Sequence, residues 1–291
     1  MNAKPVASLI FPVLNEGSHV KRTLASLLEA RSSVPFEIIL VDDGSVDGCC
    51  DFLRKTEDAG VKLLTTPGLG IAGARNTGAE AGTGDYFVFC DAHLFFRDRW
   101  LDLLLKPMMQ GIADAVSPAV GDADDPQRTG YGQTLDRSLR VRWNRKRKAP
   151  FPTPVVPGGC FAVTRRAFED VGGFDNGLAG WGYEDVELSL RLWTFGRSCW
   201  VQPAAKVLHV FRRSFPYEVK KEAVYANMLQ MAYSHFGEKR LEACRALIED
   251  ADVMEIEAAV LAAGALAQRE SFLSRRLYDD DWYMRKFRIP F

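Results

Sequence analysis

A carboxylate and an imidazole stand two residues apart at the point where an apolar run of this sequence ends. The run Tyr86–Phe89 predicts a short buried strand, and Asp91 and His93 come just after it. Because side chains at positions i and i+2 of extended backbone point the same way, both can reach one metal ion. Mixed oxygen and nitrogen ligands suit a divalent ion such as Mn²⁺. The pair alone does not establish a metal site, since Asp-x-His also occurs in ordinary polar turns.

Polar residues also follow two earlier apolar runs of the sequence. Asn15 and Glu16 come after the first run, and Asp42 and Asp43 come after the second. A carboxylate at such a place can accept a hydrogen bond from a uracil N–H or a ribose hydroxyl. Capping of the helix that follows is the alternative interpretation, but a cap accounts for one residue and not for both aspartates.

Three glycines surround the predicted start of a helix near residue 71. Gly68, Gly70 and Gly73 leave room for a ligand at the backbone amides of the helix N-terminus, where anions bind. Arg75 adds a fixed cation for a phosphate or a nearby carboxylate. The spacing matches neither the GxGxxG dinucleotide motif nor the phosphate-binding loop with its lysine. This stretch therefore indicates an anion site without identifying the anion.

A second acidic pair and a lone histidine lie in the second half of the sequence. Glu184 and Asp185 open a predicted helix, where acidic residues favour the helix dipole without any further role. The alternative is that one carboxylate removes a proton from an acceptor while the other binds a sugar hydroxyl. His209 lies in an apolar run, where a histidine is usually structural. It is also available as a third metal ligand beside Asp91 and His93.

The elements that must position these residues alternate between strand and helix over the first 120 residues. The pattern predicts strands over 6–14, 36–41, 61–64, 86–91 and 113–120, and helices over 18–30, 47–58, 71–81 and 100–110. Continuous apolar strands that alternate with amphipathic helices predict a mostly parallel α/β sheet. Ligands of such sheets bind at the carboxyl ends of the strands, and the polar clusters stand at these ends.

The remaining 171 residues are less regular. The segment 121–157 is predicted to be a long loop or a partly helical insertion. After it we expect helices over 163–171 and 183–195, a strand over 198–201, helices over 219–236 and 253–267, and an aromatic docking tail over 279–291. The basic run 140–148 is either a solvated face or a contact with an acidic acceptor, a lipid phosphate or a protein partner.

Composition excludes several classes of protein. The 291 residues are 47% hydrophobic and 26% charged, which is typical of one large globular domain or two small ones. A formal net charge of −1 argues against a general nucleic-acid binder. The sequence contains no signal peptide and no run of 18 apolar residues, and its six cysteines form no CxxC pair. We therefore expect a cytoplasmic protein, either free or peripheral at the inner face of the membrane.

Several motifs follow one another as in known enzymes. The chain resembles the family 2 nucleotide-sugar glycosyltransferases with the GT-A fold over about residues 6–235, through FPVLNE, VDDGS, GIAGARNTGA, CDAH, GGCFAV and WGYEDVELSLRLW. In its Asp-x-His, its GG-x-FA, its WGGEN-like segment and its HVFR it is most similar to the catalytic domain of polypeptide N-acetylgalactosaminyltransferases. The resemblance implies a Rossmann-like GT-A fold: a mixed, mostly parallel sheet flanked by helices, with a helical C-terminal appendage.

The resemblance also implies a domain organisation and a reaction. We expect a GT-A domain over 1–237, made of a nucleotide-binding half over 1–120 and an acceptor or catalytic half over 121–237, followed by a helical extension over 238–291. The donor would be a UDP-sugar, such as UDP-GalNAc or UDP-GlcNAc, and the cofactor Mn²⁺ or Mg²⁺. The acceptor stays open among a peptide, a glycan and a lipid-linked saccharide, and the sequence does not indicate the oligomeric state.

The same resemblance implies roles for individual residues. Asp91, His93 and His209 would hold the metal ion. The nucleotide sugar would contact Pro12, Asn15, Glu16, Asp42, Asp43, Arg75, Asp91, Ala92, Gly158, Gly159, Trp181 and Arg212. Inverting relatives have a general base in the region of Asp185, so we expect Asp185, with Glu184 beside it, to catalyse an inverting transfer.

Two departures from that family bear on these expectations. The lectin domain and the membrane anchor of the animal enzymes are absent, which favours a bacterial cytoplasmic enzyme. The family's Glu-Asn pair is Glu184-Asp185 here. The alternatives are a component of a system that polymerises a capsule or cell-surface polysaccharide, and a non-catalytic nucleotide-sugar-binding or RNA-binding protein. A sugar nucleotidyltransferase is disfavoured, because no GGxGxRL motif is found near the N-terminus.

Overall fold

The computed structural model describes residues 5–54, 60–212 and 214–291. Its strands are β1 (Ala7–Val13), β2 (Phe36–Asp42), β3 (Val61–Thr65), β4 (Tyr86–Cys90), β5 (Leu94–Phe95), β6 (Ala115–Asp122), β7 (Thr129–Tyr131), β8 (Gln133–Leu135), β9 (Val141–Trp143), β10 (Phe151–Pro152), β11 (Cys160–Thr164) and β12 (Cys199–His209). Its helices are α1 (His19–Glu29), α2 (Asp51–Arg54), α3 (Gly70–Ala81), α4 (Trp100–Met109), α5 (Arg165–Val171), α6 (Glu184–Thr194), α7 (Lys221–His235), α8 (Glu238–Arg245), α9 (Val253–Ala262), α10 (Ala265–Arg275) and α11 (Asp280–Phe287).

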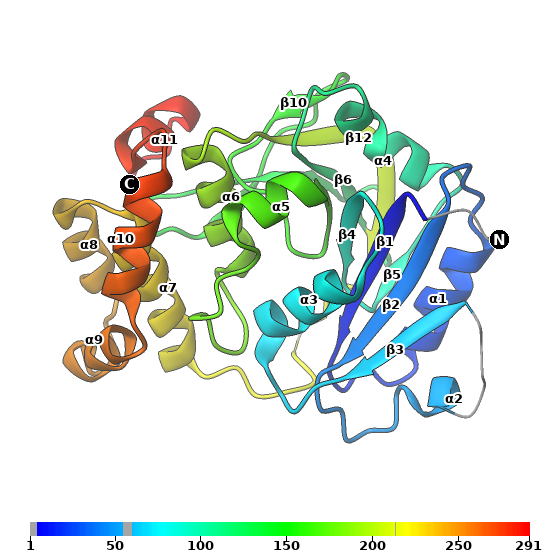
Figure 1. Ribbon diagram of the computed structural model, residues 1–291, viewed down its shortest axis with the longest axis horizontal. Coiled ribbons are helices and arrows are strands. Elements are labelled where there is room, and N and C mark those ends of the chain that lie inside the picture. Colours follow the sequence, from blue (N-terminus) through cyan, green and yellow to red (C-terminus); the bar gives the residue numbers. More distant parts are fainter. Residues whose placement is uncertain (1–4, 55–59, 213) are drawn as a thin grey trace.

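A large mixed sheet forms the centre of the molecule (Figure 1). Its strands run in the order β10-β12-β6-β11-β4-β1-β2-β3, with β5 added beside β12 and β7 beside β6. The strands β4, β1, β2 and β3 are parallel, with Ala7 opposite both Phe36 and Tyr86. Because these strands point the same way, the residues that follow β1, β2 and β4 meet at one edge of the sheet. The predicted mixed, mostly parallel α/β sheet is confirmed.

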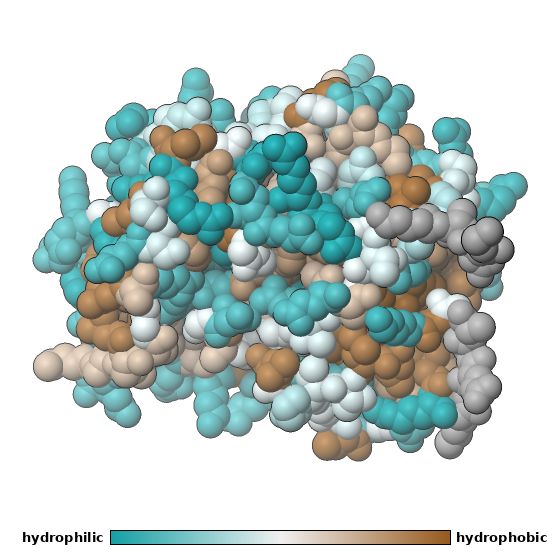
Figure 2. Space-filling view, in the orientation of Figure 1, coloured by the Kyte–Doolittle hydropathy of each residue, from teal (hydrophilic) through white to brown (hydrophobic). Residues whose placement is uncertain are grey.

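Helices cover both faces of the sheet. The apolar sides of α3, α5 and α6 pack on one face, and those of α1, α2 and α4 pack on the other. Figure 2 shows hydrophilic side chains over much of the area that α5 occupies in Figure 1, as expected for the outer side of a surface helix. Among the described helices, none combines the length and the apolar character that crossing a bilayer requires.

The strand β11 was missed by the sequence prediction. Residues 163 and 164 belong to this strand, so the helix predicted over 163–171 begins only at Arg165. The strand lies antiparallel between β4 and β6, with Phe161 opposite Phe89. Its apolar run of four residues, 160–163, is too short to distinguish strand from helix by periodicity. The strand predicted over 198–201 is also longer, because β12 continues past an irregularity at 202–206 as far as His209.

The segment 121–157 is not the loop or partly helical insertion that was predicted. It contains β7, β8, β9 and β10, and β8 and β9 form an antiparallel hairpin with Gln133 opposite Trp143. Strands of two or three residues carry no readable alternation, which explains the error. The end of the helix predicted over 47–58 falls at 55–59, outside the described residues, and α2 occupies 51–54.

The C-terminal helices α7–α11 stand at the end of the molecule that is remote from β3 (Figure 1). They share one buried apolar cluster with the sheet face under α3 and α5. The predicted docking tail contains α11, in which the buried Tyr283 hydroxyl donates a 3.0 Å hydrogen bond to the carbonyl of Pro154. The boundary at residue 237 stays a prediction, and the apolar core continues across it.

The helix α3 packs so closely on β1 that a larger residue at Gly78 is expected to destabilise the protein. A Cβ atom on Gly78 would lie 2.3 Å from Cγ2 of Ile10. We expect Gly78→Ala to lower the free energy of unfolding by about 1–3 kcal/mol through overpacking, although alanine favours helix. Urea denaturation measures the change, with the exposed Glu80→Ala on the same helix as control. A Gly78→Ala variant as stable as that control would contradict the prediction.

Candidate active site

Two neighbouring cavities lie at the edge of the sheet where β1, β2 and β4 end. The first, which we call the strand-end cavity, has a volume of about 610 Å³ and is lined by residues that follow β1 and β2 and by the start of α3. The second, the hairpin cavity, has about 530 Å³ and is lined by the β8–β9 hairpin and the start of α6. Asp91 and His209 belong to the walls of both, so these two residues mark the junction of the cavities.

At this junction the structure brings together the three predicted metal ligands. Asp91 follows β4, His93 precedes β5, and His209 ends β12, which pairs with β5 at Leu94. One ligand atom of each residue lies within 4.8 Å of the others. The Nε2 atom of His209 is 3.3 Å from Oδ2 of Asp91, and Nε2 of His93 is 3.8 Å from it. Neighbouring ligands of an octahedral ion lie about 3 Å apart when each bond is about 2.1 Å, so the group nearly fits such an ion.

The surroundings of this group also suit a metal ion. Burial acts to raise the pKa of Asp91, but the hydrogen bond from His209 and the charges of His93 and Arg75 hold it well below its ordinary value. The Nδ1 atom of His93 lies 3.2 Å from Oε2 of Glu16, which leaves Nε2 directed at Asp91. A carboxylate that orients a histidine ligand in this way is typical of metal sites.

A glycine leaves the space that the group needs. A Cβ atom on Gly159 would lie 3.1 Å from Cδ2 of His209 and 3.3 Å from Oδ2 of Asp91. The predicted Gly158-Gly159 pair therefore borders the candidate metal site. The backbone N–H of Asp91 also donates to the carbonyl of Gly159 at 2.9 Å, which ties this turn to the end of β4.

The guanidinium of Arg75 connects the candidate metal site to the acidic pair of α6. Only 1% of Arg75 is exposed. It donates to Oε1 of Glu184 at 3.1 Å, to Oδ1 of Asp91 at 3.4 Å and to the carbonyl of Gly158 at 2.7 Å. Its predicted role towards the nucleotide stays a prediction, because its partners in this structure are protein groups.

Removing this guanidinium is expected to destabilise the protein. Arg75→Met leaves Oε1 of the buried Glu184 carboxylate and the carbonyl of Gly158 without the donor that Arg75 supplies, so we expect a loss of about 3–5 kcal/mol in the free energy of unfolding. Arg75→Lys keeps the charge but not the forked geometry, and should lose less. Denaturant titration measures both. A loss below about 1 kcal/mol for Arg75→Met would show that the surrounding groups find other partners.

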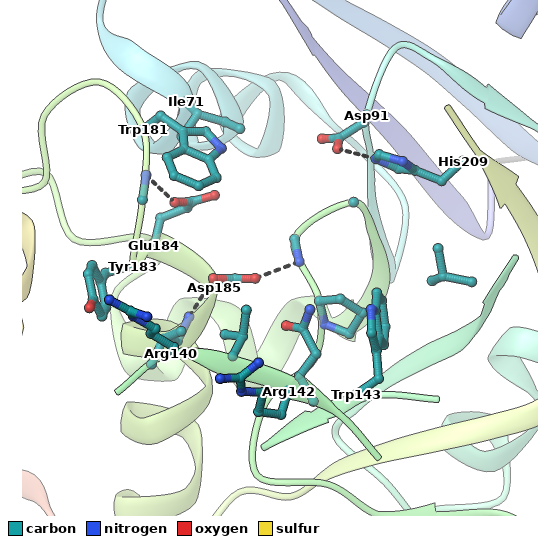
Figure 3. A pocket seen from close by; sticks show the side chains of 18 of the residues that line it. Ile71, Asp91, Arg140, Arg142, Trp143, Trp181, Tyr183, Glu184, Asp185 and His209 are labelled. Carbon is teal, nitrogen blue, oxygen red and sulfur yellow. Dashed lines mark hydrogen bonds and ion pairs between the residues drawn. The ribbon is translucent and has the colours of Figure 1, made fainter. Parts of the chain in front are cut away.

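The acidic pair lies at the first turn of α6, as predicted. Oε2 of Glu184 accepts from the N–H of Gly182 at 3.0 Å, and Oδ2 of Asp185 accepts from the N–H of Gly158 at 2.8 Å. Figure 3 shows Asp185 in the hairpin cavity, with Asp91 and His209 at one end and Arg140 and Arg142 at the other.

The protonation of Asp185 matters for what the site can do. Burial, together with the neighbouring Glu184 carboxylate, raises the pKa of Asp185 to about 7, although hydrogen bonds from Gly158 and Val186 act in the opposite direction. A carboxylate with a pKa near the working pH can both accept and release a proton, as a general base must. The site therefore combines a group that suits a metal ion with a carboxylate that suits proton transfer.

The other predicted nucleotide-sugar residues are divided between the two cavities. The strand-end cavity is lined by Pro12, Glu16, Asp43, Ala92, Trp181 and Arg212. The hairpin cavity is lined by Arg75, Gly158, Gly159, Trp181, Glu184 and Asp185. Neither cavity is lined by Asn15 or Asp42.

The aspartates after β2 have partners within the protein. Asp42 forms a 2.5 Å ion pair with Arg54 and accepts from the N–H of Ser45. Asp43 accepts from the N–H groups of Leu69 and Gly70 at 2.7 and 2.8 Å, so it holds the start of α3. The helix that Asp43 holds is α3 and not α2, which is the helix that directly follows β2. Asp43 also lines the strand-end cavity, and its contact with the nucleotide sugar stays a prediction.

Sequence reasoning missed several residues of the cavity walls. Leu139, Val141 and Trp143 line the hairpin cavity and come from the segment that was predicted to be a loop. Phe215 and Tyr217 line the strand-end cavity. The aromatic residues of 211–217 were a usable signal, whereas nothing in the sequence indicated the hairpin.

The first half of the chain matches a known family. Residues 8–172, more than half of the chain, match the family model described as Glycosyl transferase family 2. The chain belongs to this family. Residues 141–211 match a second family model, described as N-terminal domain of galactosyltransferase. The two matches together cover the candidate metal ligands and the acidic pair of α6.

Curated relatives of this family 2 member include animal enzymes. Polypeptide N-acetylgalactosaminyltransferase 11 of Xenopus tropicalis is 31% identical over 240 residues, which cover 73% of this chain and 39% of the relative. Polypeptide N-acetylgalactosaminyltransferase 10 of Rattus norvegicus is 34% identical over 239 residues, which cover 74% and 39%. The chain thus spans about two fifths of the length of these relatives.

Solved structures share the fold of this family 2 protein. The structure of GalNAc-T7 with UDP, GalNAc and Mn²⁺ matches with a TM-score of 0.74 and 21% identity, over 99% of this chain and 57% of that one. A mannosyltransferase of Pyrobaculum calidifontis in complex with GDP-Man and Mn²⁺ matches with a TM-score of 0.57 and 21% identity, over 99% and 84%. The predicted GT-A fold is confirmed.

Proposed function

We propose that this chain transfers a sugar from a UDP-sugar to a hydroxyl of a polypeptide, with a divalent metal ion at Asp91, His93 and His209. The observation that carries the proposal is the position of these three residues at the junction of two cavities, with Asp185 in the hairpin cavity. The names of the relatives support UDP-GalNAc as donor and a peptide as acceptor. In this arrangement the donor occupies the strand-end cavity and the acceptor occupies the hairpin cavity.

The residues present fit Mn²⁺, and when bound it would stabilise the negative charge that develops on the leaving diphosphate. The Asp185 carboxylate accepts the proton of the acceptor hydroxyl. The hydroxyl oxygen then forms a bond to the anomeric carbon, while the bond from that carbon to the diphosphate oxygen breaks and UDP leaves with the electron pair. Attack from the face opposite UDP inverts the anomeric centre.

A donor screen tests this proposal. Purified protein is incubated with Mn²⁺ and each of UDP-GalNAc, UDP-GlcNAc, UDP-glucose and UDP-galactose, with and without a threonine-containing peptide. We expect hydrolysis or transfer with one of them, together with thermal stabilisation, since a ligand at 100 times its Kd adds about 2.7 kcal/mol. Absence of both effects with every nucleotide sugar would overturn the proposal. Proton NMR of the product shows whether the anomeric centre is inverted.

The pKa of Asp185 predicts the pH dependence of transfer. Because the base must be ionised and its pKa is raised to about 7, kcat/KM should rise about tenfold per pH unit below pH 7 and level off above it. Initial rates between pH 5.5 and 9 measure the profile at saturating Mn²⁺. A flat profile between pH 6 and pH 8 would contradict the assignment of Asp185 as the base.

A further inference from the structure

The segment 137–148 carries a concentration of positive charge beside the hairpin cavity. Within these twelve positions the basic residues are Arg137, Arg140, Arg142, Arg145, Lys146, Arg147 and Lys148, and no residue is acidic. The strand β9 lies in this segment and all three of its residues are exposed. Arg140 and Arg142 line the hairpin cavity, together with Asp185.

The turn between β8 and β9 fixes the place of Arg140. Leu139 adopts a left-handed backbone conformation (φ 54°), while its side chain is buried and lines the cavity. Oδ1 of Asp136 accepts from the N–H groups of Ser138 and Arg140, at 2.9 and 3.1 Å. A turn with a non-glycine residue in this conformation is held by its surroundings, so Arg140 starts from a defined position.

The two arginines of the cavity wall differ in their partners. The guanidinium of Arg142 pairs with the carboxylate of Asp136 at 2.8 Å. In the described part of the chain, the guanidinium of Arg140 has no ion pair or hydrogen bond. Figure 3 shows it beside Tyr183, on the same side of the cavity as Asp185. Arg140 is therefore an exposed cation without an ion-pair partner among the described residues, at the wall of a cavity that also holds the candidate base.

We propose that Arg140 binds an acidic side chain of the acceptor peptide, next to the hydroxyl that Asp185 deprotonates. This proposal rests on the proposed function and adds a charge preference to it. An acidic peptide suits the place better than a lipid headgroup does, because Arg140 lines a cavity whose wall also includes the apolar side chains of Val141 and Trp143. Trp143 is 41% exposed and offers a flat surface for a peptide backbone or side chain.

A pair of matched peptides tests the preference. Each has a single threonine flanked at the same positions by glutamate in one peptide and by glutamine in the other. Binding is measured by fluorescence anisotropy with UDP and Mn²⁺ present, and transfer is measured separately. We expect the acidic peptide to bind about fivefold more tightly, which is typical of one partly exposed ion pair. Arg140→Ala should abolish that difference, whereas Arg137→Ala, exposed at the same turn, should preserve it.

The outcomes separate this proposal from the proposed function. Equal binding of the two peptides, no binding of either, or an equal loss in Arg137→Ala and Arg140→Ala would overturn the role of Arg140. Vesicles that contain phosphatidylserine are added as a competitor. If they abolish the preference by binding to Arg140, the ligand of this arginine is a lipid phosphate, and the proposal of a peptide ligand is overturned. Transfer without any charge preference supports the proposed function while overturning this inference.

An independent observation concerns Asn227 of α7. This side chain is 1% exposed, and in the described part of the chain its hydrogen bonds all go to backbone groups of the loop 179–182. Its Oδ1 accepts from the N–H of Ala179 at 2.9 Å, and its Nδ2 donates to the carbonyls of Ala179, Trp181 and Gly182 at 2.9, 3.3 and 3.0 Å. One side chain thus binds a complete turn of backbone.

That loop connects the parts of the candidate site. The carbonyl of Gly180 accepts from the N–H of Ile71 at the start of α3, and the N–H of Gly182 donates to Glu184. Trp181 lines both cavities. We infer that Asn227 is a positioning residue, which holds Trp181 and Glu184 in place from the C-terminal helices.

A comparison of two variants on α7 tests this role. Asn227→Ala should lower kcat by about 10- to 100-fold, since small displacements of reacting groups have effects of this size. Amide hydrogen exchange should increase in 179–185. Gln230→Ala is the control, because Gln230 is equally buried on α7 but bonds to Asp175 and Gln268 instead of the loop. Two results would overturn the positioning role of Asn227. One is an equal increase of amide hydrogen exchange in 179–185 in both variants. The other is a loss of kcat that each variant's lower melting temperature fully explains.

Discussion

Replacing Asp185 with asparagine is expected to reduce transfer by about 100- to 10,000-fold, the usual contribution of a general base. The substitution keeps the size of the side chain and its acceptor for the N–H of Gly158 at 2.8 Å. It removes the ability to take a proton, and it replaces Oδ1, which accepts from the N–H of Val186 at 2.8 Å, with an amide nitrogen that cannot accept. Donor binding should be unchanged, because Asp185 lines the hairpin cavity and not the strand-end cavity. Initial rates and calorimetric titration with UDP give the two measurements.

Stability provides a control for this variant. The pKa of Asp185 is raised to about 7 in the folded protein, above the value of about 3.9 in an unfolded chain. Ionisation of Asp185 therefore makes the folded state less stable as pH rises from about 4 to 7, and asparagine removes this effect. The variant should be at least as stable as the original protein at pH 8. Unchanged turnover, or loss of donor binding in a folded variant, would contradict the assignment.

Replacing His209 with alanine is expected to abolish metal-dependent activity. The substitution removes one of three converging ligand atoms, and Asp91 and His93 alone leave an incomplete set. Affinity for Mn²⁺ should fall about 100-fold or more, beyond the 10- to 100-fold effect of losing an outer partner of a metal ligand. Electron paramagnetic resonance of free Mn²⁺, titrated with protein and UDP, measures the affinity. Transfer is assayed with the same samples.

His19 offers a matched control for the metal site. Its ring lies 6.3 Å from that of His93, but it does not belong to the group of converging ligands. His19→Ala should retain both Mn²⁺ affinity and transfer. Equal losses in the two variants would indicate that loss of any nearby imidazole has the same effect, and would contradict the role of His209 as a ligand. Retained Mn²⁺ binding in His209→Ala would show that the ion does not use His209.

The parallel half of the fold was predictable because each of its strands can be recognised from its own residues. Runs such as 9–11 and 38–41 are continuous and apolar, and polar or turn residues follow the strands that contain them, so neither the strand nor its polar end depends on distant residues. The position of the strand β11 depends on residues that are distant in the sequence. Its place between β4 and β6 is set by pairing with residues about 70 positions earlier, which a local pattern cannot show. The β8–β9 hairpin pairs residues only 6 to 10 positions apart, and it was missed because strands of three residues show no readable alternation.

The candidate site shows the same division between local and distant information. The pair Asp91 and His93 was visible as a local spacing. The contact of Arg75 with Glu184 joins residues 109 positions apart, and that of Asp185 with Gly158 joins residues 27 apart. Motif order suggested that these residues belong together, but not which atoms meet. Asp42 shows the converse, since its partners Ser45 and Arg54 lie within 12 positions of it. Asp43 belongs with the distant contacts, because it accepts from the N–H groups of Leu69 and Gly70, which are 26 and 27 positions away.

The buried apolar cluster that joins the sheet to the C-terminal helices has a consequence for how the molecule unfolds. Phe161 of the sheet, Leu188 of α6 and Tyr283 of α11 belong to this one cluster. Elements that share a continuous core lose it together, so the helices after residue 237 are part of the same cooperative unit as the sheet. Heat or denaturant would then abolish the cavities and the C-terminal helices in a single transition.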